Sequence, residues 1–107
     1  MPNVQMVFDQ KSNRYHLNGI LSLETVPLIK NRILDVVKST GEQQLVEFEL
    51  SRVTRMDSVG LSLMVEITRT AKRSGKELKF YNIQDQVCAI ARVSSLEVVL
   101  PIYRDAV

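Results

Sequence analysis

Residues 55–63, Arg-Met-Asp-Ser-Val-Gly-Leu-Ser-Leu, constrain the fold more than any other segment, because they join an apolar strand to an amphipathic helix. The strand is expected at Leu45–Leu50, where side chains alternate between two faces, and residues 51–55 carry the chain on to the junction. The helix is expected to run from about Ser58 to Ser74. Its predicted buried stripe consists of Leu61, Met64, Val65, Thr68 and Ala71.

Strands and helices alternate along the rest of the chain. We expect a hairpin of two strands, at Val4–Phe8 and Arg14–Asn18, with a bulge or a close backbone approach at Gly19. The other expected elements are a helix that starts at Ser22 or at Glu24-Thr25 and ends near Lys38, a strand at Glu77–Tyr81, and a third helix with Val87, Ile90, Ala91 and Ser94 on its inner face. Ser95–Leu100 is expected as a short strand or extended segment that stops at Pro101. This order predicts a single α/β domain over residues 1–107, with a mixed, mostly parallel sheet of four to five strands, an N-terminal hairpin and about three helices.

The charges are nearly balanced, with 14 basic and 12 acidic residues and a net charge of +2. A nucleic-acid-binding protein should show a basic stripe with base-reading or aromatic residues, so we expect no nucleic-acid partner. Glu47 and Glu49 share one face of their strand, which predicts that this face is partly wet. A local basic excess has helical spacing and predicts a solvated face; it consists of Arg69, Lys72, Arg73, Lys76 and Lys79.

The sequence gives no sign of export or membrane insertion. Cys88 is the single cysteine, which excludes an internal disulfide, and its apolar surroundings predict a buried, inert thiol. The N-terminus has no signal-peptide pattern, and no apolar run approaches the roughly 20 residues of a membrane span. We expect a cytoplasmic protein that reaches a membrane, if at all, through a partner.

The residues of common catalytic sites are absent or isolated. His16 is the single histidine, so no zinc site can be completed from a second histidine or a cysteine pair. No nucleophile elbow, Walker loop or Gly-x-Gly-x-x-Gly motif occurs, and Asp57 has no evident carboxylate partner for acid–base chemistry. We therefore expect neither an enzyme nor a cofactor.

Two roles are possible for Ser58. It can be a helix N-cap whose hydroxyl accepts a hydrogen bond from the N–H of Gly60 or Leu61. It can also combine that cap with contact to a partner protein or a phosphate at the helix N-terminus. Gly60 in the first turn costs up to about 1 kcal/mol relative to alanine. A function would explain that cost, because a missing side chain would let a partner approach Ser58. The residue types alone leave both readings open.

The segment Leu50–Leu61 resembles the signature of the STAS domain family, in which Asp-Ser/Thr-x-Gly-Leu follows an apolar strand and opens a helix. Leu17–Gly19, Ala71–Leu78 and Ile90–Leu96 resemble other conserved segments of that family. The resemblance extends from about Val4 to Leu100 and implies a STAS-type fold that acts by binding proteins.

Two branches of the family offer different partners. The first is a small subunit of a bacterial phospholipid ABC transporter, which maintains outer-membrane lipid asymmetry and packs on the ATPase subunit. The second is the anti-sigma-factor antagonist, whose serine at the position of Ser58 is phosphorylated by an anti-sigma-factor kinase. The end at Leu100-Pro101 and the segment Asp57–Arg73 resemble the transporter subunit. Residues 19–22 depart from the family's Gly-Glu-Leu-Asp, and Val59 is less typical of a kinase substrate.

The resemblance therefore predicts a non-catalytic subunit that docks on the transporter ATPase, cytoplasmic and peripheral at the inner membrane through that partner. The alternative is an antagonist switched by phosphorylation of Ser58. The predicted docking residues are Asp57, Ser58, Val59, Gly60 and Ser62, with Glu66, Arg69 and Arg73 at the rim.

Overall fold

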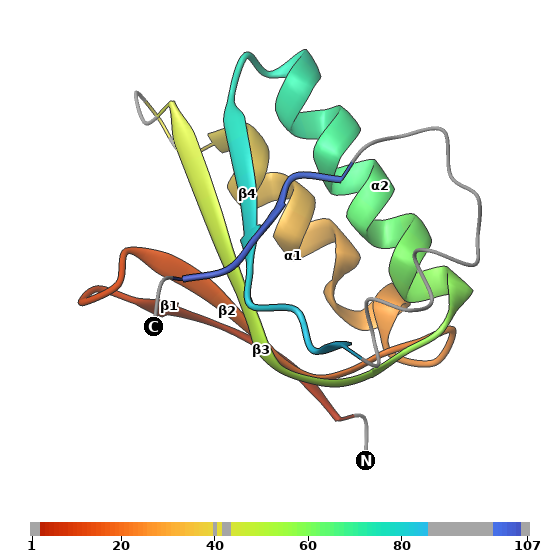
Figure 1. Cartoon of the computed structure of the whole chain (residues 1–107). Coiled ribbons are helices and arrows are strands. Elements are labelled where there is room, and N and C mark those ends of the chain that lie inside the picture. The colour runs from red at the N-terminus through yellow and green to blue at the C-terminus, as the bar shows by residue number, and fades with distance from the viewer. Residues whose placement is uncertain (1–2, 40, 42–43, 86–99, 106–107) are drawn as a thin grey trace.

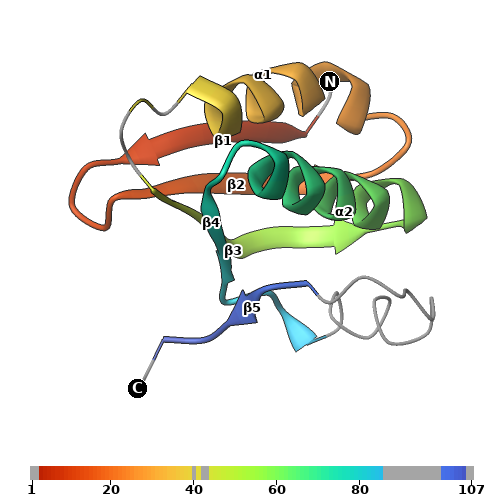
Figure 2. The ribbon, with the colours of Figure 1, turned by 90° about the horizontal axis from the view of Figure 1, so that it is seen from above.

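The two helices of the described residues lie on one face of a five-stranded sheet (Figures 1 and 2). The structure is a computed structural model, and it describes residues 3–39, 41, 44–85 and 100–105. The elements in chain order are β1 (Val4–Asp9), β2 (Arg14–Leu21), α1 (Val26–Ser39), β3 (Leu45–Met56), α2 (Ser58–Arg73), β4 (Glu77–Tyr81) and β5 (Ile102–Tyr103).

The strands lie in the sheet in their sequence order. β1 and β2 form the predicted antiparallel hairpin, whereas β2–β3, β3–β4 and β4–β5 are parallel pairs. Each parallel connection needs a crossover, and α1 and α2 provide the first two over the same face. The mixed, mostly parallel sheet expected from the sequence is confirmed.

The hydrophobic core fills the space between that sheet face and the helices. Phe48 and Phe80 lie opposite each other in the β3–β4 register and are fully buried, with ring centroids 5.9 Å apart. The buried stripe of α2 is wider than predicted, because Leu63, Ile67 and Thr70 are also buried while Thr68 is only partly buried. The helix therefore packs on both the sheet and α1.

Gly19 has the close backbone approach expected from the sequence. Its φ is +101°, and a Cβ at this position would lie 2.3 Å from the Asn3 carbonyl oxygen. The neighbouring Ile20 N–H donates to that same oxygen at 2.7 Å, and the β2–β3 register shifts between Gly19 and Ile20. A side chain here would push the N-terminal segment away from the sheet.

Strand β3 differs from the prediction in length and in burial. It runs for 12 residues, Leu45–Met56, and does not stop at Leu50, because residues 52–56 still pair with the end of β2. Glu49 was expected to face water, but it is 94% buried, with a relative exposure of 6%. The charged and polar side chains of Arg14 and Asn82, both distant in sequence, satisfy its carboxylate.

Only part of the structure predicted for the C-terminal region falls within the described residues. The predicted third helix, Cys88 and residues 95–99 lie outside the described residues. Leu100 is not in a strand, and β5 begins after Pro101 rather than ending at it. Pairing of Phe80 with Ile102 and of Tyr81 with Tyr103 decides this position.

Candidate functional site

Asp57, between Met56 of β3 and Ser58 of α2, is the N-cap of α2. Its Oδ1 accepts hydrogen bonds from the backbone N–H groups of Val59 at 2.9 Å and Gly60 at 3.1 Å. Its extended backbone, with φ −106° and ψ −171°, is typical of a cap. The cap was predicted at Ser58, and that assignment is wrong, because Ser58 is already the first helical residue.

The second carboxylate oxygen of Asp57 reaches the loop between β2 and α1. Oδ2 accepts from the Leu23 N–H at 3.0 Å, and the Asp57 N–H donates to the Leu21 carbonyl at 3.1 Å. Partial burial favours a raised pKa for this carboxyl, but the N–H groups of Leu23, Gly60 and Val59 together hold its pKa below the ordinary value. Asp57 is thus ionised at neutral pH and positions two segments at once.

Ser58 is exposed at the first position of α2. Within residues 3–85 and 100–105, as far as the structure describes them, no hydrogen bond involves its Oγ; its carbonyl accepts from Ser62 Oγ at 2.9 Å. Because Asp57 supplies the cap, the Ser58 hydroxyl is available for an external contact.

Gly60 does not have the role expected from the sequence. It is buried, and a Cβ there would lie 2.4 Å from the Leu21 carbonyl oxygen and 2.7 Å from Met56 Cγ. The missing side chain therefore lets α2 approach the ends of β2 and β3 closely. Gly60 faces the interior, and its place among the partner-contacting residues is a correction.

The remaining predicted residues divide between the core and one outward line on α2. Val59 is half-buried and packs against the core. We define the outer ridge of α2 as Ser58, Ser62, Glu66, Arg69 and Arg73, which follow each other at helical spacings of three or four residues. All are exposed except Glu66, which is partly buried and forms an ion pair with Lys30 of α1 at 3.0 Å.

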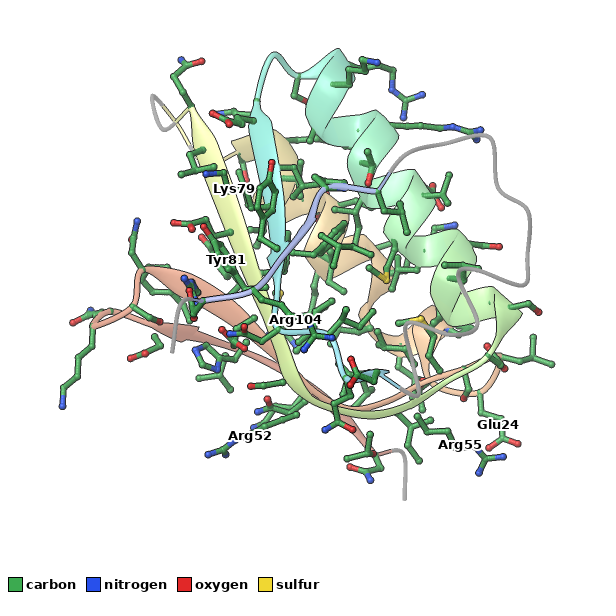
Figure 3. All side chains as sticks on the ribbon, in the orientation of Figure 1. Glu24, Arg52, Arg55, Lys79, Tyr81 and Arg104 are labelled. Carbon is green, nitrogen blue, oxygen red and sulfur yellow. The ribbon has the colours of Figure 1, made fainter. Side chains whose placement is uncertain are left out.

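A pocket of about 700 Å³ lies beside the cap and was not predicted from the sequence. Glu24 and Arg55 lie near each other at its rim (Figure 3). Leu23 and Leu28 are 68% and 56% exposed. Leu28 lies in α1 but is not one of its buried residues, and Leu23 precedes the helix. The lining includes Leu23, Glu24, Thr25, Leu28, Arg55 and Asp57.

A polar cluster connects the start of β2, the middle of β3 and the residue after β4 to the C-terminal segment. Arg14 holds Asp105 through two bonds of 2.7 Å and Glu49 through one of 2.8 Å, and Asn82 donates to both carboxylates. Hydrogen bonds from Arg14 and then from Asn82 hold the pKa of the Asp105 carboxyl well below its ordinary range. The cluster fixes β5 to the sheet.

The single histidine, His16, and Ser58 lie far apart in the described structure. His16 lies opposite Glu49 in the sheet, and its Nε2 is 3.4 Å from Ser12 Oγ and 3.8 Å from Asp9. Seven further residues of extended strand, about 23 Å, separate Glu49 from Met56, so His16 cannot pair with Ser58. The described part of the chain contains no group of three potential metal ligands and no helix long and apolar enough to cross a membrane.

A family model described as "Mlab, STAS domain" matches residues 4–101 of the 107. The chain belongs to the STAS domain family. The match covers β1 to the start of the C-terminal segment, and it includes Asp57, Ser58 and the whole of α2.

Solved structures have the same fold as this STAS domain. The unphosphorylated anti-sigma-factor antagonist SpoIIAA is 16% identical, with a TM-score of 0.65 over 97% of this chain and 89% of that one. A STAS protein from Planctomyces limnophilus is 14% identical, with a TM-score of 0.71 over 97% and 91%. A serine-to-glutamate variant of Moorella thermoacetica RsbS is 16% identical, with a TM-score of 0.66 over 96% and 87%.

Proposed function

We propose that this STAS domain is a non-catalytic subunit that docks on the ATPase of a phospholipid ABC transporter and supports its activity. The observation that carries the proposal is the exposed Ser58 hydroxyl, which forms no hydrogen bond with the described residues because Asp57 caps the helix. The family model's description and the resemblance of Asp57–Arg73 to transporter subunits support this branch.

The outer ridge of α2 gives the docking surface a defined charge pattern. Ser58 and Ser62 offer small polar groups near the positive end of the helix dipole. Glu66 is already paired with Lys30, whereas Arg69 and Arg73 have no carboxylate within ion-pair distance among the described residues. A partner with small residues opposite the serines and acidic side chains opposite the arginines would complement this ridge. The ATPase would then hold the domain peripherally at the inner membrane.

The test is co-purification with the ATPase subunit of the transporter, followed by measurement of its stability and ATP hydrolysis with and without this chain. Ser62→Arg should abolish the complex by placing a long charged side chain on the ridge. Ser39→Arg on α1 is a matched control, because both serines are exposed and both donate to the carbonyl four residues earlier. An ATPase that is equally stable and active without this chain contradicts the proposal.

Phosphorylation of Ser58 is the second candidate function. The exposed hydroxyl at a helix N-terminus and the fold shared with SpoIIAA, solved in unphosphorylated and phosphorylated forms, support it. A phosphoryl group would add about −1.5 to −2 charges beside ionised Asp57 and would repel a partner fitted to the neutral hydroxyl. Incubation with an anti-sigma-factor kinase and ATP, read by intact mass, tests this candidate. An unchanged mass, or partner binding indifferent to Ser58→Asp, argues against it.

A further inference from the structure

The pocket beside Asp57 contains an unusual amount of exposed apolar surface. The structure describes five large hydrophobic side chains that are clearly exposed, and two of them, Leu23 and Leu28, line this one pocket. The other three, Val7, Phe8 and Tyr103, lie on the hairpin and on β5. Apolar side chains gathered in a hollow indicate a binding site more strongly than scattered ones do.

The charges around the pocket point to the chemistry of what binds there. Arg55 is exposed at the rim, and no carboxylate of the described residues lies within ion-pair distance of it. The Asp57 carboxylate, which also lines the pocket, is engaged by three backbone N–H groups. Glu24 is exposed and likewise has no basic partner among those residues. An acidic group on the ligand would therefore complete an ion pair with Arg55.

We infer that this pocket binds a segment of the partner protein in which an apolar side chain seats against Leu23 and Leu28 and a nearby carboxylate pairs with Arg55. The inference rests on the proposed function and deepens it by giving the partner's chemistry. Asp57 lines the pocket and directly precedes Ser58, so one partner can cover the pocket and the outer ridge together.

The first measurement is the affinity of the purified transporter ATPase for five variants. Leu28→Ser and Arg55→Glu should each weaken binding about tenfold or more. Val7→Ser and Arg52→Glu are matched controls, because Val7 is an exposed apolar residue on β1 and Arg52 an exposed arginine three residues earlier on β3. Glu24→Gln should bind as tightly as the wild type or more tightly. Thermal unfolding confirms that each variant is folded.

The second measurement tests the pocket without the ATPase. Peptides from a random display library are selected on the wild-type domain and counter-selected on the double variant Leu28→Ser/Arg55→Glu. We expect enrichment of an apolar residue close to an Asp or Glu, with amide NMR shifts at Leu23 and Thr25. The domain should not co-sediment with vesicles that contain phosphatidylglycerol.

The outcomes separate the two ideas. If the wild type binds the ATPase and both Leu28→Ser and Arg55→Glu bind it as tightly as the wild type does, the pocket inference fails and the proposed function stands. If the wild type does not bind the ATPase, the proposed function fails and the peptide selection alone decides the pocket. The inference is overturned if the selected peptides are basic or share no motif. It is also overturned if the amide NMR shifts occur elsewhere in the domain, or if the domain binds vesicles in a way that depends on Arg55.

Discussion

The Asp57 carboxylate accepts a hydrogen bond from the Leu23 N–H at 3.0 Å, across 34 residues of sequence. The same carboxylate caps α2 through its other oxygen. The loop that forms one wall of the pocket and the first turn of the helix that presents Ser58 are thus held by one side chain. A substitution that shifts the β2–α1 loop should therefore also shift the first turn of α2, and the reverse should hold.

Replacing Asp57 tests this double role. Asp57→Ala should lower the free energy of unfolding by about 2–3 kcal/mol, because it removes the cap and the bond to Leu23. Asp57→Asn should lose much less, since asparagine is an equally good cap. Urea denaturation gives both values, and exposed Asp35→Ala on α1 is the control, expected within about 0.5 kcal/mol of wild type. Equal losses for the alanine and asparagine variants would show that capping is not the cause.

Gly60→Ala should be destabilising although alanine favours helices. The added Cβ would lie 2.4 Å from the Leu21 carbonyl oxygen, a backbone atom that cannot move aside easily. Overpacking of this kind costs about 1–3 kcal/mol, against a gain of up to about 1 kcal/mol in helix propensity. The melting temperature should fall, whereas the exposed Lys72→Ala on the same helix should leave it nearly unchanged. A Gly60→Ala variant as stable as the wild type would mean that α2 does not approach β2 so closely.

Ser58→Ala distinguishes a capping serine from a free one. Because Asp57 is the cap, we expect the free energy of unfolding to change by less than about 0.5 kcal/mol. A serine that capped the helix would instead lose about 1 kcal/mol on replacement. Chemical denaturation monitored by circular dichroism measures the difference. A loss of about 1 kcal/mol in the free energy of unfolding would show that Ser58 caps the helix.

Arg14→Met should be among the most destabilising single changes in the chain. It leaves Glu49, whose side chain is 8% exposed, without its cationic partner. Removing one member of a buried ion pair typically costs about 3–5 kcal/mol. The double variant Arg14→Met/Glu49→Met should recover part of that loss, because no uncompensated charge remains. Strictly additive effects in this double-mutant cycle would show that the two side chains do not interact.

The lowered carboxyl pKa values of Asp57 and Asp105 predict acid sensitivity. In the unfolded chain both groups titrate near 3.8. In the folded chain they stay ionised to lower pH, so their stabilisation is complete above that value. It is lost as the pH falls through the folded pKa values. Urea titrations between pH 7 and pH 2 should show this decline, with a shallower acid limb in Asp105→Asn. An unchanged acid limb in that variant would contradict the shift at Asp105.

The helix and strand types followed from local patterns. The period of the apolar residues placed α1, α2, β1 and β4 to within a few residues, because each buries one face whatever lies opposite it. The end of β3 was wrong, because residues after Leu50 look polar on their own and pair only once β2 lies beside them. The prediction that Glu49 faces water was wrong for the same reason. Its burial depends on Arg14, which is 35 residues away.

The junction at residues 55–63 was identified from sequence alone, but its parts were not assigned correctly. Both Asp57 and Ser58 can cap a helix, and residue type does not say which of two neighbours has the extended backbone of a cap. The role of Gly60 depended on how closely α2 approaches Leu21. The pocket combines residues from the β2–α1 loop, α1 and β3, so no local pattern contains it.

The sequence by itself therefore determined the family, the order of elements from β1 to β4, and the position of the candidate site at a strand-to-helix junction. These depend on short-range periodicity and on a contiguous motif. The tertiary structure decided what each residue of that junction does. The Asp57 carboxylate accepts hydrogen bonds from two segments, and Gly60 lets α2 pack closely on β2. The Ser58 hydroxyl forms no hydrogen bond with the described residues. These assignments follow from contacts between residues far apart in the chain, which form only when the helices close onto the sheet.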